Sequence, residues 1–283
     1  MKLALGTAGW RTTYGAIPSK PLSTSEIRSL TYQSHLLGFS WLDTAQGYAD
    51  SESIIGEISP PQQIATKIVV DADNLSGIAT LIDKSLDNLK LPVLNLVFIH
   101  NWDSLNNTSK ELAVSCLEKL KSLKKISSWG FSTYETSEFS WVVKLGLNGV
   151  HIQINSNVLD QRLLFHDLDK SMQEFVNMDN SVWVRSIFLQ VILLIPTPSN
   201  PFFNHPSVVN FYKYCQATGF SPLEVCLSYA KSLSACGNLI LGVNNLKELE
   251  EIATAIEIAP SELDLKALKS NDINLIDPRF WKR

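Results

Sequence analysis

Short apolar segments alternate with longer amphipathic segments along almost the whole chain, and this alternation constrains the fold more than any other feature. The short segments have the length and composition of buried strands, and the longer ones have helical periodicity. Strands are predicted at Leu3–Gly6, Trp41–Asp43, Ile64–Lys67, Leu94–His100, Ile126–Ser132, Gly149–Ile154, Val182–Ser186 and Leu239–Leu241. Helices are predicted near Ser23–Leu37, Ser51–Ile58, Gly77–Leu89, Ser109–Leu123, Thr136–Leu145, Leu164–Asn177, Ser207–Thr218, Ser221–Ser232 and Lys247–Ile258.

Strands that are apolar throughout pair in parallel and are covered by helices. Strand–helix units repeated along a chain of 283 residues can close into a barrel, which leaves no sheet edge exposed. We therefore predict an α/β fold with a single (β/α)8 TIM barrel domain over residues 1–283. A doubly wound open sheet is the alternative, but the segment after the first strand, Gly6–Gly9, lacks the G-x-G-x-x-G motif of that fold.

The charge balance excludes several partners. The chain has 24 Lys plus Arg and 28 Asp plus Glu, and no basic run exceeds Lys124–Lys125, so we expect neither nucleic acid nor an anionic membrane as a partner. No segment approaches the roughly 20 apolar residues that cross a bilayer. We expect a cytoplasmic protein that is a monomer or a weak homo-oligomer. The 4 cysteines form no C-x-x-C pair and the histidines have no metal-site spacing, so free thiols and no metal are predicted.

Polar side chains stand at the carboxyl ends of most predicted strands. Each has an ordinary structural explanation when taken alone, such as a helix cap or a satisfied core histidine. The carboxyl ends of parallel barrel strands form one rim, however, and barrel enzymes build their sites there. The residues are Asp43, Lys67, His100, Ser132, Gln153, Arg185 and Ser186. Together they predict a functional site at this rim.

Asp43 and Lys67 end neighbouring strands, so their charges are expected to meet at the mouth of the barrel. Tyr48 lies five residues after Asp43, in a loop that can fold the phenol back over the barrel axis. An adjacent ammonium favours the phenolate, so we expect the pKa of Tyr48 to fall. With His100, these residues would form a proton-transfer group that uses neither a metal nor a nucleophile.

Several blocks of the sequence, in the right order and over nearly the whole chain, resemble those of the aldo-keto reductase superfamily. The most specific block, Asp43–Glu52, resembles the segment D-T-A-x-x-Y-G-x-S-E. The others are Leu5–Ala8, Thr66–Lys67, Phe98–His100, Trp129–Ser132, Gln153–Asn157, Val184–Gln190 and Leu241–Val243. The chain departs from the family pattern at Ala49, Ser156, Val191, Asn244 and Ile252.

The resemblance implies an NADP(H)-dependent oxidoreductase that reduces an aldehyde or ketone, with Tyr48 as general acid and a small-molecule carbonyl compound as substrate. Lys67 would tune Tyr48, Asp43 would hold Lys67, and His100 would orient the carbonyl group. The resemblance also implies a set of cofactor contacts: Ser132 and Gln153 to the nicotinamide carboxamide, Arg185 to its ring, and Ser186, Gly242, Asn244 and Lys247 to the rest of NADP(H). NAD(H) is the alternative cofactor, because Lys247 is the sole cation near Asn244 in the sequence.

Two other functions remain open. The changed cofactor blocks would also suit a catalytically weak barrel that acts as a regulatory or binding protein. Lys67 at a strand end would suit a Schiff-base aldolase. Aromatic residues in the rim loops are expected to form the walls of a substrate pocket: Trp10, Tyr14, Trp102, Phe202 and Phe203.

Overall fold

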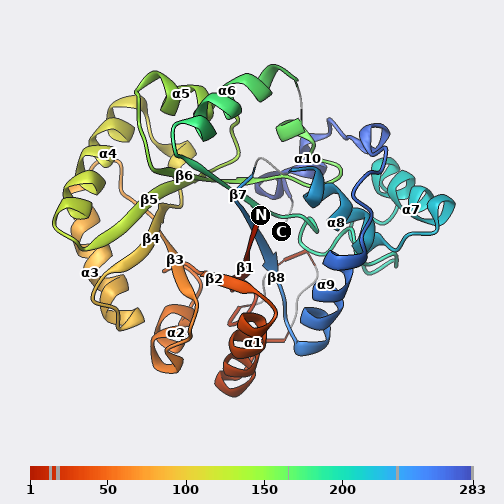
Figure 1. The fold of residues 1–283 in the computed structure, drawn as a ribbon, viewed down its shortest axis with the longest axis horizontal. Coiled ribbons are helices and arrows are strands. Elements are labelled where there is room, and N and C mark those ends of the chain that lie inside the picture. Colours follow the sequence, from red (N-terminus) through yellow and green to blue (C-terminus); the bar gives the residue numbers. More distant parts are fainter. Residues whose placement is uncertain (13–14, 17–19, 165, 234–235, 282–283) are drawn as a thin grey trace.

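The computed structural model describes residues 1–12, 15–16, 20–164, 166–233 and 236–281. Its parallel strands pair in sequence order and β8 pairs with β1, so the sheet closes into a barrel (Figure 1). The strands are β1 (Lys2–Gly6), β2 (Phe39–Asp43), β3 (Gln63–Ile68), β4 (Leu94–Ile99), β5 (Ile126–Thr133), β6 (Val150–Asn155), β7 (Ser181–Arg185) and β8 (Asn238–Gly242). The predicted (β/α)8 barrel is confirmed, and every predicted strand forms.

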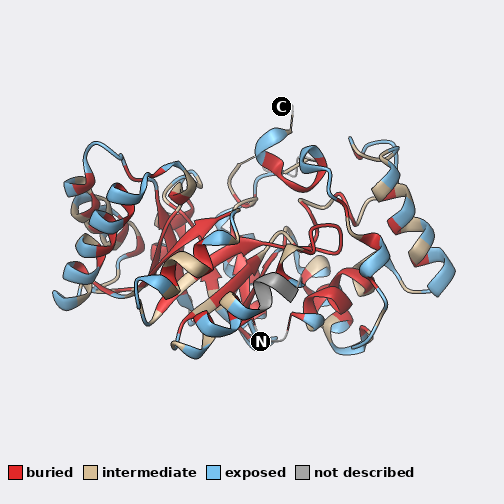
Figure 2. Cartoon of the chain, turned by 90° about the horizontal axis from the view of Figure 1, so that it is seen from above, coloured by how far each residue is buried: buried red, intermediate tan, exposed pale blue. Residues whose placement is uncertain are grey.

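Helices surround the barrel on its outer face (Figure 1). They are α1 (Thr24–Leu36), α2 (Ser51–Ile58), α3 (Ile78–Leu89), α4 (Asn107–Ser122), α5 (Ser137–Lys144), α6 (His166–Asn177), α7 (Pro206–Thr218), α8 (Pro222–Ser232), α9 (Leu246–Ile258) and α10 (Ile273–Ile276). All but α10, which is a single turn near the carboxyl terminus, agree with the predicted helices. Figure 2 shows that the buried residues gather in the strands and on the helix faces that cover them.

Two helix starts follow from short sequence signals. Ser23 caps α1 by accepting a hydrogen bond from the backbone N–H of Glu26, whose carboxylate accepts one from the backbone N–H of Ser23. Ser221 and Glu224 make the same reciprocal pair at α8, where Pro222 occupies the first position. Each pair satisfies helix N–H groups that would otherwise lack partners.

The barrel interior combines large and small side chains. Trp183 contacts Trp41 and Phe98 edge to face, with ring centroids 5.1 Å and 5.7 Å apart. Small residues on other strands, such as Ala4 and Ala65, leave room for these rings. This layer forms the floor under the polar rim.

One glycine is required by the close approach of two strands. A Cβ atom on Gly130 of β5 would lie 1.9 Å from the backbone oxygen of His151 on β6. Any side chain would therefore push β5 and β6 apart and disturb the rim position of Gln153, which pairs with Ser132 two residues further along.

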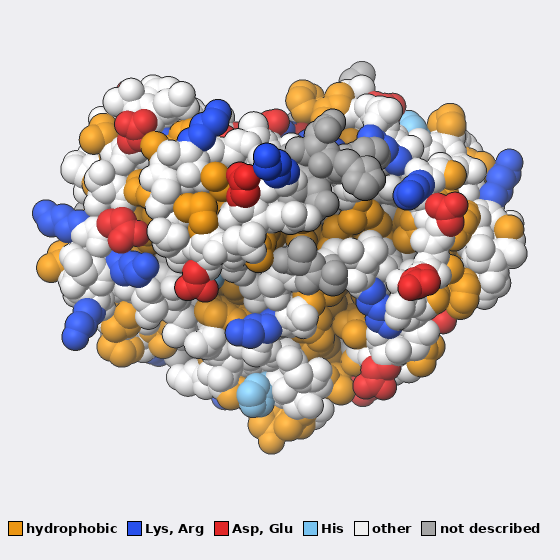
Figure 3. Space-filling view, turned by 45° about the horizontal axis from the view of Figure 1, so that its top comes forward, with side chains coloured by type: hydrophobic (Ala, Val, Ile, Leu, Met, Phe, Trp, Pro, Cys, Tyr) orange, Lys and Arg blue, Asp and Glu red, His pale blue; other side chains and the backbone are white. Residues whose placement is uncertain are grey.

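Acidic and basic side chains are interspersed on the face drawn in Figure 3, as the balanced composition predicts. In the described part of the chain, no helix is both long and apolar enough to cross a membrane. All 4 cysteines are free thiols, as expected, and only Cys116 is partly accessible. The described residues contain no group of three or more His, Cys, Asp or Glu side chains that could hold a metal ion.

Candidate functional site

The parallel strands bring the predicted polar residues to one end of the barrel. Asp43 and Arg185 are the last residues of β2 and β7, Lys67 is the residue before the last of β3, and His100 follows β4 directly. At the same level, Gly6 of β1 pairs with both Asp43 and Gly242. The rim expected from the sequence is therefore present.

Asp43 makes two contacts with buried groups. Its Oδ2 atom lies 2.6 Å from the Nζ atom of Lys67, and its Oδ1 atom accepts a hydrogen bond of 2.8 Å from the amide of Gln153. Lys67 is only 2% exposed and also donates to the backbone oxygen of Thr44 at 3.0 Å. A buried ammonium needs such partners, because its desolvation would otherwise cost several kcal/mol.

Tyr48 is carried over the barrel mouth by a loop that is tied to β3. The backbone N–H of Thr44 donates to Ala65 O at 2.8 Å, and that of Gln46 donates to Lys67 O at 3.0 Å. Ala49, which follows Tyr48, has a φ of 51°, in the left-handed region that favours glycine. This conformation gives a physical reason for the glycine of the family pattern at this position.

Tyr48, Lys67 and His100 lie together, as predicted. The Nζ atom of Lys67 is 5.2 Å from the centre of the Tyr48 ring. The rings of Tyr48 and His100 meet edge to face, with centroids 6.1 Å apart. A carbonyl oxygen held between the phenol and the imidazole would meet two hydrogen-bond donors and a nearby positive charge.

The pKa of Tyr48 differs from the expectation. Burial raises the pKa of the phenol above its usual value, the charge of Asp43 raises it further, and Arg185 lowers it. The expected fall was wrong because it considered the cation of Lys67 and left out the burial of the phenol and the negative charge of Asp43. Tyr48 is therefore protonated at neutral pH, which is the form that a general acid needs.

The imidazole of His100 is neutral at physiological pH. Burial lowers the pKa of His100 to about 3, and the positive charges of Lys67 and Arg185 contribute to the same shift. A neutral imidazole carries a single N–H, so it can donate one hydrogen bond to a substrate oxygen without competing with Tyr48 as the acid.

A pocket extends from Asp43 and Tyr48 across the rim to the loop after β8. The sequence-predicted residues that line it are Asp43, Tyr48, Gln153, Arg185, Ser186, Gly242 and Asn244. Gly6 at the end of β1 and Ala8 and Gly9 in the loop after it, which lacks a dinucleotide-binding motif, also line the wall. Ser132 is outside the lining, but it is buried and pairs in register with Gln153, and Lys247 lies on α9 outside the lining.

Gln153 has the free hydrogen-bonding capacity that a nicotinamide site requires. Its amide nitrogen is used by Asp43, but among the described residues its Oε1 atom is buried without a hydrogen-bond partner. A buried acceptor without a partner is costly, and a carboxamide N–H would satisfy it. The residues of the pocket therefore fit the implied cofactor.

The loop after β7 forms one wall of the pocket with a strained backbone. Leu189, Gln190 and Val191 are consecutive residues with φ values of 46°, 52° and 66°, and Ser186 has a φ of 64°. Val191 is the least suited to this conformation, because its branched side chain crowds the backbone. Here again, the family pattern has glycine where this chain has a larger residue.

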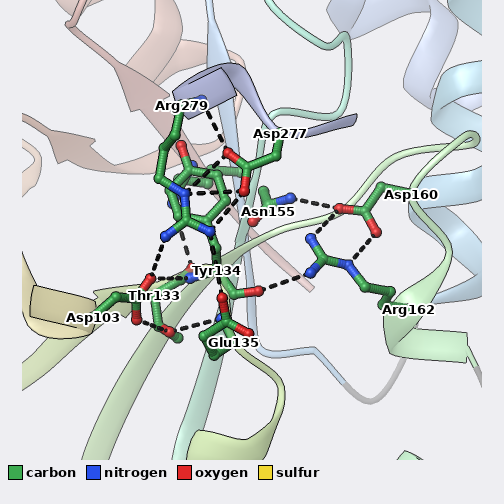
Figure 4. Close-up of polar contacts among 10 residues, drawn as sticks. Asp103, Thr133, Tyr134, Glu135, Asn155, Asp160, Arg162, Asp277 and Arg279 are labelled. Carbon is green, nitrogen blue, oxygen red and sulfur yellow. Dashed lines mark hydrogen bonds and ion pairs between the residues drawn. The ribbon is translucent and has the colours of Figure 1, made fainter. Parts of the chain in front are cut away.

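Arg185 is held by a group of rim residues that the sequence did not reveal. Its guanidinium lies 4.4 Å from the ring centre of Tyr134, and that of Arg279 lies 4.0 Å from the same centre. Arg279 also pairs with Asp277 at 2.6 Å and with Asp103 at 3.1 Å (Figure 4). The carboxyl-terminal segment is thus fixed to the loops after β4 and β5, next to the pocket.

The loop between β8 and α9 is organised by a carboxylate. Glu248 accepts hydrogen bonds from the backbone N–H of Asn244 at 2.9 Å and from the side-chain amide of Asn245 at 2.8 Å. Lys247, which was expected to bind the cofactor, is 85% exposed in its side chain, with its Nζ atom 3.7 Å from Glu251. No sequence motif marks Glu248 as a site residue.

The expectation of aromatic substrate walls was wrong for two residues. Trp10 is fully buried and its indole N–H donates to Val243 O, while Trp102 is fully buried and its indole N–H donates to Glu138. Phe202 is partly buried against Trp281. Phe203 is also partly buried, and Tyr14 lies outside the described residues.

Comparison with known proteins identifies the family. The model of the aldo/keto reductase family matches residues 2–273. The holo form of aldo-keto reductase AKR11C1 from Bacillus halodurans has a similar structure, with a TM-score of 0.75 and 17% identity over 99% of this chain and 95% of the other. Its apo form gives a TM-score of 0.71 and 19% identity over 90% and 88% of the two chains. A search of curated proteins gave no significant match.

The two solved structures support the barrel fold, and the family model matches nearly the whole chain, including the loop and strand ends that carry the polar rim. This chain belongs to the aldo/keto reductase family.

Proposed function

We propose that the protein reduces an aldehyde or ketone to the alcohol, with Tyr48 as the general acid. The observation that carries this proposal is the contact of Tyr48 with Lys67 and His100, and of Lys67 with Asp43. Two of these residues, Asp43 and Tyr48, line a pocket that fits a nicotinamide cofactor. A bound reduced nicotinamide would supply the hydride. The protein's part is to hold the carbonyl oxygen and to protonate it as negative charge develops.

Each residue of the group has a role that follows from its charge. Tyr48 is protonated and gives its proton to the developing alkoxide. Lys67 stabilises the tyrosinate that remains, and Asp43 holds Lys67 in place through their 2.6 Å contact. His100, a neutral donor, orients the carbonyl oxygen toward Tyr48.

The cofactor would be held along the pocket between the loops after β7 and β8. Gln153 and Ser132 would bind the carboxamide, Arg185 would lie against the ring, and Ser186 and Gly242 would border the diphosphate. The sequence-based proposal of NADP(H) depends on a cation for its 2′-phosphate. The pairing of Lys247 with Glu251 gives this preference over NAD(H) little support.

The Schiff-base alternative is weakened by the same contacts. A lysine nucleophile must be neutral, whereas the carboxylate of Asp43 favours the ammonium form of Lys67.

A binding protein without catalysis is favoured by one observation, the strained backbone of Val191 in the pocket wall. The cytoplasmic location, the single domain and the monomeric or weakly associated state remain predictions.

Wild-type protein and Tyr48→Phe should be compared in an assay with NADPH, NADH and a panel of aldehydes and ketones, followed at the nicotinamide absorbance. We expect the wild type to turn over and Tyr48→Phe to lose on the order of a hundredfold or more in rate, because only the transferable proton is removed. Tyr32→Phe is a matched control, because Tyr32 is 57% exposed on α1. Wild-type turnover that survives in Tyr48→Phe would overturn the proposal, as would a wild type that reduces no carbonyl compound with either cofactor.

A further inference from the structure

The far end of the pocket lies at the loop between β8 and α9. The pocket begins at Tyr48 and Gln153 and reaches Gly242, Val243 and Asn244. Asn244 also lines a neighbouring surface hollow. A dinucleotide whose nicotinamide lies at Tyr48 would extend its adenosine half toward this loop, which would place the adenosine ribose near Asn244.

A carboxylate already occupies the hydrogen-bond donors of this loop. Glu248 lies in the first turn of α9 and accepts from the backbone N–H of Asn244 at 2.9 Å, from its side-chain amide at 3.3 Å, and from the side-chain amide of Asn245 at 2.8 Å. Asn245 in turn caps α9 by accepting from the N–H of Glu248 at 2.9 Å. These groups would otherwise be natural partners for a phosphate at a helix N-terminus.

Among the described residues, charges of both signs lie around this loop, and Arg28 of α1 lines a hollow together with Leu246. Glu26 of α1 lines the hollow next to Asn244. Lys20 acts on Glu26, where it contributes to a lowered pKa that comes mainly from hydrogen bonds to Ser23. Lys247 lies beside Glu251, with an Nζ–Oε1 distance of 3.7 Å. Glu250 adds a further negative charge to the same helix.

We propose that Glu248 determines cofactor specificity by disfavouring the 2′-phosphate of NADP(H), so that the protein binds NAD(H) at least as tightly as NADP(H). This inference rests on the proposed function, and it replaces the sequence-based preference for NADP(H). Like charges at close range repel, whereas a carboxylate can accept hydrogen bonds from the hydroxyl groups of an unphosphorylated ribose.

The test is the equilibrium dissociation constant of the full chain for NADPH and NADH, measured by titration calorimetry. The adenosine fragments 2′,5′-ADP and 5′-AMP provide a second pair that probes the same subsite without the nicotinamide. We expect the wild type to bind NADH at least as tightly as NADPH. Glu248→Gln should lower the ratio of the NADPH dissociation constant to the NADH dissociation constant by on the order of tenfold. The substitution removes one negative charge and keeps the shape of the side chain.

Glu250→Gln is the matched control, because it removes the same charge from an exposed position of α9 that makes no contact with the loop in the described structure. Tighter binding of NADPH than of NADH by the wild type would overturn the inference. An equal shift in Glu248→Gln and Glu250→Gln would do so too, as would an equal loss of both cofactors in Glu248→Gln.

The outcome for the proposed function can be read separately. A wild type that prefers NADPH but shows Tyr48-dependent carbonyl reduction would overturn the role of Glu248 and support the proposed function. Binding of neither dinucleotide would overturn both. Added salt should also weaken the discrimination against NADPH in the wild type, because salt screens the repulsion between Glu248 and the 2′-phosphate. The effect should be smaller in Glu248→Gln, which lacks this charge.

Discussion

Asp43 connects the two halves of the candidate site. Its carboxylate holds the ammonium of Lys67 on one side and the amide of Gln153 on the other, at 2.6 Å and 2.8 Å. The first contact belongs to the proposed proton-transfer group. The second uses the amide nitrogen of Gln153 and leaves its Oε1 atom as the acceptor for a ligand. Loss of Asp43 would therefore disturb the proposed proton transfer and the proposed cofactor site together.

At the residue scale, the charge of Lys67 should be visible in the pH profile of alcohol oxidation. In the proposed mechanism, oxidation needs the tyrosinate form of Tyr48 as a base, and burial and Asp43 both raise the pKa of this phenol. In Lys67→Met the cation 5.2 Å from the ring centre is lost while Asp43 remains. The rising limb of the profile should therefore move to higher pH.

Lys67→Arg keeps a cation near the ring and provides the control for this change. Its rising limb should stay close to that of the wild type, even if the rate falls. A lower rate in Lys67→Met with an unmoved limb would show that Lys67 does not act on the ionisation of Tyr48.

The residue identities of the rim could be predicted from the sequence because each follows a recognisable strand. The direction of the Tyr48 pKa shift could not, because it depends on burial and on the balance between two opposite charges. Glu248 was missed for a similar reason. A glutamate in the first turn of a helix is an ordinary stabilising residue, and only its contacts with Asn244 and Asn245 connect it to the pocket.

At the scale of elements, the loop between β7 and α7 has the most unusual backbone near the site. Three consecutive residues from Leu189 to Val191 have positive φ values, and none of them is glycine. Such conformations cost about 1–3 kcal/mol each and persist where the surrounding structure enforces them. Gln190 and Val191 also line the pocket, so this strain lies in the pocket wall.

Val191→Gly should raise the free energy of unfolding by about 1 kcal/mol. Relief of the strain at a φ of 66° exceeds the about 0.4–1 kcal/mol lost to the greater freedom of glycine in the unfolded chain. Urea unfolding measures this change, and Val191→Ala is the control because it keeps a Cβ atom. A glycine variant less stable than the alanine variant would contradict the account of strain.

The elements themselves were well predicted, and the contacts between distant elements were not. The capping pairs Ser23–Glu26 and Ser221–Glu224 are local in sequence, so their helices could be placed. Arg279 lies 176 residues from Asp103, and no local pattern indicates that the two form an ion pair beside the pocket. The short helix α10 and the segment after it were missed because their position depends on such contacts.

At the scale of the whole molecule, the closed barrel followed from the alternation of apolar strands and amphipathic helices, because few folds bury such strands on both faces. The closed strand order also explains why Asp43 and Gln153, which are 110 positions apart in the sequence, are in contact. The cofactor preference does not follow from the fold, because it depends on charges in one loop at the edge of the barrel.

In the proposed reaction, the carbonyl carbon receives a hydride from a bound nicotinamide and the carbonyl oxygen receives a proton from Tyr48. The most direct measurement uses the preferred cofactor deuterated at the transferable position, with an aldehyde substrate, and determines the label in the alcohol by mass spectrometry. We predict one deuterium on the carbinol carbon for each cofactor oxidised by the wild type, and on the order of a hundredfold slower labelling in Tyr48→Phe with its cofactor affinity retained. Alcohol formed without the label, or labelling at the wild-type rate in Tyr48→Phe, would contradict the account.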